Sequence, residues 1–199
     1  MTAADRGQAF TLEGFVAALV LLSSVVFALQ MTAVTPLSPS TSSQHLEGQQ
    51  AAVAAGLLDQ AAANGSLRPA LLYWNESTGG FHGASAKGYY TSCTAPLAFG
   101  VRLDRAFTDR GVACNVQLRY VTATGSLGVE RLVYAGTPTD DAVLASATVT
   151  LYDDDVLYGV DGRPTGTTLA NATTFYAPDA DPGSPVYNVV QVQVIAWRM

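Results

Sequence analysis

The longest uncharged stretch of the chain lies near its N-terminus, where no Asp, Glu, Lys or Arg occurs between Glu13 and Glu47. Residues 15–34 are almost wholly apolar. Twenty helical residues, each rising about 1.5 Å, span about 30 Å, the thickness of the hydrocarbon core of a bilayer. Apolar positions surround the helix instead of forming one stripe, which argues against a surface-lying amphipathic helix. The pattern predicts a membrane-spanning helix within residues 8–35, with a cleaved secretory signal peptide as the alternative.

A second helix is predicted after two prolines. Pro36 and Pro39 cannot lie inside a regular helix without breaking its hydrogen bonds, so the first helix is expected to end near Thr35. Thr41 and Gln44 then fit a capping box, apolar residues follow at helical spacing, and Asn64-Gly65 supplies a stop. The members of the apolar face are Leu46, Val53, Ala54, Leu57, Leu58 and Ala61. The segment 36–64 is therefore predicted to be an amphipathic helix that packs on a sheet.

The remainder of the chain, residues 65–199, has the pattern of a sheet. Short stretches of β-branched and aromatic residues are separated by Gly, Pro, Asn and Asp, which favours mainly antiparallel strands. In the clearest stretch, Val190, Val192 and Val194 alternate with glutamines. The expected strands are 70–74, 97–103, 114–123, 129–134, 143–152 and 187–197. The predicted fold class is α+β: a transmembrane helix, an amphipathic helix and a β-sheet head.

The charge balance narrows the choice of partner. Sixteen acidic residues against ten basic ones give a formal net charge of -6, and Lys87 is the only lysine. Because no basic run is present to neutralise phosphates, nucleic acid is not an expected partner. The acidic, strongly hydrated surface suggests a high-salt habitat, although drift in a GC-rich genome would give the same bias.

Two features of residues 64–199, a pair of cysteines and a set of glycosylation sequons, favour a location outside the cytoplasm. Cys93 and Cys114 are the only cysteines, and no neighbouring ligand completes a metal site, so a disulfide is expected, with two free thiols as the alternative. N-glycosylation sequons begin at Asn64, Asn75 and Asn171. These features predict a single-pass protein of the cell membrane whose C-terminal domain is extracellular.

The residues before the apolar helix are more specific. Arg6-Gly7-Gln8-Ala9-Phe10-Thr11-Leu12-Glu13 joins a short basic-Gly leader directly to the apolar stretch. This leader resembles the class III signal peptide of type IV pilins and archaellins, and residues 6–50 are similar to pilin-like membrane proteins of haloarchaea. The resemblance implies that a prepilin peptidase cuts between Gly7 and Gln8, which removes residues 1–7 and leaves the helix attached as the anchor.

Glu13 has a role in that resemblance. A carboxylate at the edge of the hydrocarbon is costly unless it is paired. In pilins the corresponding Glu meets the freed α-amine of a neighbouring subunit, so the resemblance implies an assembly contact for Glu13. Here Glu13 is the sixth residue counted from Gln8, whereas pilins usually place this Glu fifth. A Glu that reaches out to the lipid headgroups is the alternative.

Catalytic and metal chemistry have little support in the sequence. His45 and His82 are the only histidines, and neither lies in a motif. No phosphate loop, dinucleotide fingerprint, CxxC pair or HExxH motif occurs, so neither a cofactor nor an enzyme is expected. A weak calcium candidate is formed by Asp153, Asp154, Asp155 and Asp161. The alternative for these residues is an acidic turn between strands.

The expected function is that of a pilin-like subunit, major or minor, of an archaeal type IV pilus-like surface filament, with a structural and adhesive role. Its expected partners are the membrane, a prepilin peptidase and other pilin-like subunits. The alternative is a single-pass, membrane-anchored extracellular protein that binds or senses a ligand and does not polymerise.

Overall fold

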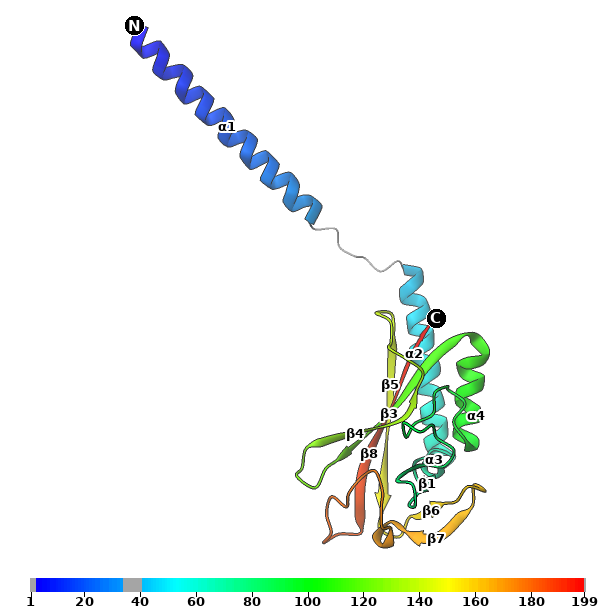
Figure 1. Cartoon of the computed structure of the whole chain (residues 1–199). Helices are drawn as coiled ribbons and strands as arrows, with labels where there is room; N and C mark the ends of the chain where they lie inside the picture. The colour runs from blue at the N-terminus through cyan, green and yellow to red at the C-terminus, as the bar shows by residue number, and fades with distance from the viewer. Residues whose placement is uncertain (1–2, 34–40, 199) are drawn as a thin grey trace. The chain divides into compact units, whose positions relative to one another are not determined.

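The computed structural model describes residues 3–33 and 41–198 and divides the chain into two compact units, Met1–Thr41 and Ser42–Met199. The first unit contains helix α1, Ala3–Ala33. The second, which we call the head domain, contains every strand that the structure describes (Figure 1). The predicted α+β architecture, with an N-terminal apolar helix and a mainly antiparallel sheet, is confirmed.

Four antiparallel strands form the main sheet, in the order β4-β3-β8-β5. They are β3 (Val112–Val121), β4 (Leu127–Tyr134), β5 (Val143–Tyr152) and β8 (Val186–Arg198), and each lies where the alternating pattern predicts a strand. The central strand β8 pairs with β3 on one side and with β5 on the other. Its valines at 190, 192 and 194 are fully buried on the inner face, while the glutamines between them face outward.

The connection from β4 to β5 covers one end of the outer face of the sheet. It must cross β3 and β8, because β4 and β5 are the two edge strands. The side chain of Asn115 holds it: Nδ2 donates to the carbonyl oxygen of Gly136, and the N–H of Ala135 donates to Oδ1, both at 2.8 Å. The paired residues Ala113 and Trp197 are consequently buried although they lie on the outer face.

Helix α2, Thr41–Ala63, covers the inner face of the sheet (Figure 1). Ala54, Leu57, Leu58 and Ala61 are buried at helical spacing, as predicted. The first half of the predicted stripe is wrong, because Leu46 and Val53 are 38% and 37% exposed. The side chains of the predicted capping box lie outside the described residues.

The segment predicted as a strand over 97–103 is instead helix α4, Leu97–Ala106. Its apolar residues alternate with period two, which is typical of a strand, but the structure buries Phe99 and Leu103, four residues apart, and leaves Val101 51% exposed. Gly100 allows the close packing at the start of the helix, since a Cβ there would lie 1.4 Å from the main-chain oxygen of Ala95.

The strand predicted over 70–74 is also wrong. Helix α3, Leu67–Leu71, takes up its first two residues, with Pro69 in the first turn, where a missing N–H breaks no helical hydrogen bond. Only Trp74 belongs to a strand, β1 (Trp74–Asn75), which pairs with β2 (Gly80–Phe81). The apolar run suggested a strand because consecutive residues are buried from both sides by the folded domain.

Short elements complete the head domain. A second hairpin consists of β6 (Val156–Tyr158) and β7 (Pro164–Thr168), and single 3₁₀ turns occur as η1 (Thr108–Arg110) and η2 (Leu169–Asn171). Aromatic rings from β1, β2, β3, β8 and the loops that follow β2 and precede β8 form one cluster, which consists of Trp74, Phe81, Tyr90, Tyr120, Phe175, Tyr176 and Tyr187.

Candidate functional site

Helix α1 presents apolar side chains on all sides within its own unit. Phe15, Leu21 and Phe27 are each about 65% exposed. The segment Glu13–Gln30 has a mean hydropathy of 1.9, and its 18 residues cover about 27 Å at about 1.5 Å per residue. The hydroxyls of Ser23 and Ser24 donate to main-chain oxygens one turn earlier, which lowers their cost in an apolar medium. A helix of this length and composition serves as a membrane anchor or as a signal sequence.

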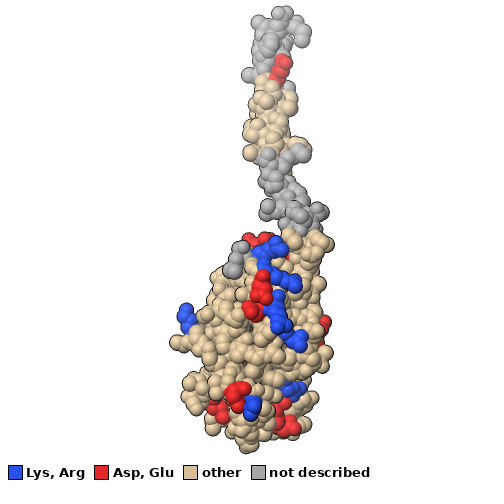
Figure 2. All heavy atoms as spheres, turned by 90° about the vertical axis from the view of Figure 1, so that its right-hand side faces the viewer, with Lys and Arg blue, Asp and Glu red and all other residues tan. Residues whose placement is uncertain are grey.

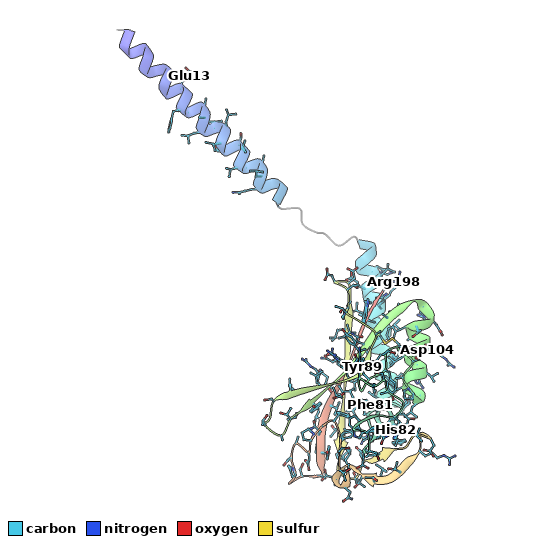
Figure 3. All side chains as sticks on the ribbon, in the orientation of Figure 1. Glu13, Phe81, His82, Tyr89, Asp104 and Arg198 are labelled. Carbon is cyan, nitrogen blue, oxygen red and sulfur yellow. A yellow bond between two sulfur atoms is a disulfide. The ribbon has the colours of Figure 1, made fainter. Side chains whose placement is uncertain are left out.

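The predicted processing and assembly residues all belong to this helix. The backbone of α1 runs through Arg6, Gly7 and Gln8, whose side chains lie outside the described residues. Glu13 stands at the start of the apolar segment and is exposed (Figure 3). Cleavage after Gly7 and a subunit contact at Glu13 stay predictions.

The predicted disulfide between Cys93 and Cys114 is confirmed, with a Cα–Cα distance of 5.8 Å. Both residues are buried. Cys114 lies on β3 opposite Ala196 of the central strand β8, and Cys93 lies in the loop before α4. The bond therefore ties this loop to the middle of the sheet.

Two of the three sequons lie beside each other in the head domain. The sequon at Asn75 includes Glu76, and Oε1 of Glu76 accepts hydrogen bonds from the N–H and the hydroxyl of Thr173, at 2.6 and 3.0 Å. Thr173 is the hydroxyl residue of the sequon at Asn171. Asn64 lies apart from these two, in the turn after α2, where its Oδ1 accepts the N–H of Ser66. Glycosylation at these positions stays a prediction.

The structure gives two aspartates of the calcium candidate, Asp155 and Asp161, another role. Nη1 of Arg68 donates to both carboxylate oxygens of Asp155, at 2.6 and 2.5 Å, and the guanidinium also lies over the ring of Tyr152. Asp161 caps its own turn by accepting the N–H of Arg163. Within the described residues, no three acidic, His or Cys side chains gather as metal ligands. Asp155 thus joins α3 to the turn after β5, which agrees with the acidic-turn alternative.

Glu130 and Tyr176 are titratable groups that lie close together at the aromatic cluster. Glu130 stands on β4 opposite Leu118 of the inner face, and burial raises the pKa of its carboxyl, against a smaller opposing effect of Arg131. Burial also raises the pKa of the Tyr176 hydroxyl well above its ordinary value, with the charge of Glu130 as a further cause. The Tyr176 hydroxyl is buried and has no hydrogen-bond partner among the described residues.

The two histidines lie apart in the described residues, one in the turn after β2 and one on α2. The ring of His82 lies 4.9 Å from the ring of Tyr73, measured between centroids, and the main-chain oxygen of His82 accepts the hydroxyl of Tyr90 (Figure 3). On α2, Nε2 of His45 lies 3.0 Å from the side-chain nitrogen of Gln49, which stands one helical turn later. Both histidines therefore have structural neighbours that are ordinary for a turn and an exposed helix.

Two adjoining grooves lie where α2, α4 and the end of β8 meet. The first has a volume of about 350 Å³, the second about 390 Å³, and they share Ala106 and Arg110. Leu46, Val53 and Phe107 give the first groove an apolar lining. Four arginines line the pair of grooves: Arg102, Arg105, Arg110 and Arg198. Because the two grooves adjoin, we refer to them together as the arginine groove. Figure 2 shows basic side chains grouped on the face that carries α2 and α4, with acidic side chains among them.

The arginine groove was not predicted from the sequence. If residues 97–103 form a strand, neighbouring positions on it point to opposite faces, and no grouping with later residues is expected. In the helix that forms, Arg102 and Arg105 are three residues apart and share a face. Their helical spacing is the signal that could have revealed the groove.

Comparison with known proteins assigns the chain to a protein family. No curated protein and no solved structure matches the chain. One protein family, described as a family of unknown function (DUF7288), matches residues 6–196, which is nearly the whole chain and includes most of α1 and of the head domain. The chain therefore belongs to the DUF7288 family.

Proposed function

We propose that this protein is a non-catalytic, pilin-like subunit of a type IV pilus-like surface filament, processed after Gly7 and assembled through α1. In this proposal the head domain lies outside the cell and takes part in adhesion and in contacts between subunits. A prepilin peptidase and other pilin-like subunits are its partners, and no nucleic acid or cofactor is involved.

The observation that carries the proposal is the order of the elements. An apolar helix with side chains exposed all round is followed by α2, whose buried face packs on an antiparallel sheet. A helix of this kind needs an apolar environment on every side, which either a bilayer or a bundle of identical helices supplies. The single acidic residue of the span, Glu13, stands at its first position, where a partner's amine or water is within reach.

One observation favours the alternative, a single-pass binding or sensing protein that does not polymerise. Helix α1 ends at Ala33 and α2 begins at Thr41, with Pro36 and Pro39 between them in the sequence. In pilins one helix runs from the membrane into the head. The arginine groove would be the ligand site in this alternative.

The mature N-terminus tests the first step of the proposal. Mass spectrometry of the chain isolated from its own cells should find an N-terminus at Gln8. An N-terminus at Met1 or Thr2 would support a plain anchor, and one beyond Gln30 would show that α1 is a removed signal sequence. Filaments sheared from the cell surface should also contain the chain.

A substitution at Glu13 tests assembly itself. Glu13→Gln should leave the chain in the membrane, because it makes the helix more apolar, and should deplete it from sheared filaments. Asp59→Asn, which neutralises an exposed acidic residue of α2 in the same way, is the matched control. Equal filament content in both variants would contradict a role of Glu13 in assembly.

A further inference from the structure

The arginine groove holds four of the ten basic residues of an acidic chain. Among the described residues the ion pair between Arg68 and Asp155 is the only one, so none of the four arginines forms an ion pair there, although Glu47 and Asp141 line an adjoining pocket together with Arg198. Arg102 donates to Oε1 of Gln60 at 2.5 Å, which fixes its position on the wall of the groove. A guanidinium has five N–H donors in a planar fork that matches a carboxylate. The arginines of the groove therefore retain N–H donors that can bind carboxylates of a partner.

The lining of the groove restricts the kind of partner. Leu46 and Val53 contribute exposed apolar surface next to the arginines. Asp104 lies on α4 (Figure 3) and Asp109 on η1, and both stand among the arginines in the sequence. These acidic residues disfavour an extended polyanion, such as nucleic acid or an anionic lipid surface, because they repel a continuous negative charge. A protein that presents a few separate carboxylates fits better.

The opposite end of the head domain presents such carboxylates. Asp153 and Asp154 follow β5, Asp179 and Asp181 precede β8, and the N–H of Asp153 donates to the oxygen of Pro185, which joins the two loops. Asp154 and Asp181 are exposed and carry this surface, whereas Asp153 and Asp179 are half-buried and Oδ1 of Asp153 is buried. No arginine or lysine of the described residues forms an ion pair with these four aspartates. We call these two loops the acidic loops.

One chain cannot bring its acidic loops to its own arginine groove. Arg198 ends β8 beside the groove, and the acidic loops flank the beginning of the same strand. Thirteen strand residues at about 3.3 Å each place these ends about 40 Å apart. A second copy shifted along the direction of β8 would bring them together.

We infer that the arginine groove binds the acidic loops of a second copy, so that head domains associate head to tail. Such a contact joins two different surfaces and leaves one of each free, so it extends into a filament instead of closing a dimer. It also lets subunits with a net charge of -6 approach each other. This inference rests on the proposed function, since it requires a chain that polymerises.

Cysteine pairs in the full-length chain test the contact. Both native cysteines are in a disulfide, so introduced cysteines are the only free thiols. R105C combined with D181C, expressed in cells and oxidised with copper phenanthroline, should give a ladder of dimers, trimers and larger species on a non-reducing gel. T124C combined with D181C is the control, because Thr124 is exposed in the turn between β3 and β4, away from the groove.

The outcomes separate this contact from the proposed function. A missing ladder, or dimers formed equally well by R105C alone, would overturn the head-to-tail contact, even if sheared filaments contain the chain. A ladder without filaments would retain the contact and overturn the filament proposal.

Charge reversal gives a second measurement. R102E/R105E should lower the chain content of filaments about tenfold or more, and adding D154R/D181R to the same chain should restore it. Retention of the Cys93–Cys114 disulfide shows that each variant folds. Failure of the combined variant to recover more than R102E/R105E alone would also overturn the inference.

Discussion

Replacing both cysteines by alanine (C93A/C114A) should weaken the head domain by an amount that the structure allows us to calculate. The disulfide joins residues 21 positions apart. Closing a loop of this length in the unfolded chain is worth about 3 kcal/mol in the chain-entropy description. Because both sulfurs are buried, their removal also costs packing, so the loss of unfolding free energy should be about 3 kcal/mol or slightly more.

Tryptophan fluorescence of the full-length chain in detergent micelles measures this loss during urea unfolding. The chain has two tryptophans, Trp74 and Trp197, and both are buried in the head domain, so the signal reports on this unit and not on α1. For a domain of about 150 residues the same loss lowers the Tm by roughly 6–12 °C. C93A alone should behave like the double variant, because either substitution removes the cross-link.

Wild-type protein unfolded with and without dithiothreitol is the internal control, since reduction should reproduce the loss seen in the variant. A difference below about 1 kcal/mol in both experiments would refute the reasoning, because the loop entropy alone exceeds it. Dithiothreitol should act only above the onset of unfolding, as both sulfurs are buried in the fold.

Three further predictions concern packing and charge. Gly100→Ala should cost about 3 kcal/mol of unfolding free energy because its Cβ has no space, whereas Gly48→Ala, on the open surface of α2, should stabilise by up to about 1 kcal/mol in the same urea assay. Arg68→Met should cost about 2 kcal/mol by leaving Asp155 unpaired, and calcium should not restore the Tm. The raised pKa of Glu130 contributes stability below the ordinary Glu pKa of about 4.3 that is lost as the pH rises through the folded value. Glu130→Gln should therefore stabilise the domain at pH 7 and have little effect at pH 4, and equal effects at both pH values would contradict this.

The elements that the sequence predicts well are those whose pattern does not depend on a partner. Helix α1 is recognisable because its length and its uniform apolar surface suffice for a membrane span. Strands β3, β4, β5 and β8 are recognisable because each is a stretch of eight or more residues rich in β-branched and aromatic residues, and in β8 the valines alternate with glutamines. The disulfide is predicted because the chain has two cysteines and no neighbouring ligands with which they would form a metal site.

The elements that the sequence predicts wrongly have apolar runs that fit two structures. Leu97, Phe99, Val101 and Leu103 alternate as a strand does, yet α4 buries the second and fourth of them and exposes the third. Leu46 and Val53 extend the apolar face of α2, but they border the arginine groove. Which side of a short apolar segment is buried depends on the surface it meets, and that surface is made by residues far away in the chain.

Sequence by itself therefore determined an apolar N-terminal helix, a second helix, an antiparallel sheet and a disulfide, because each rests on local periodicity, length or pairing. Only the tertiary structure decided which polar groups meet. Asp155 is matched by Arg68, 87 residues earlier, and Glu76 by Thr173, 97 residues later. Arg198 joins the arginines of α4 only because β8 ends beside that helix. Such meetings are set by the order of the strands in the sheet and by the helices that cover it, which no local pattern of residues encodes.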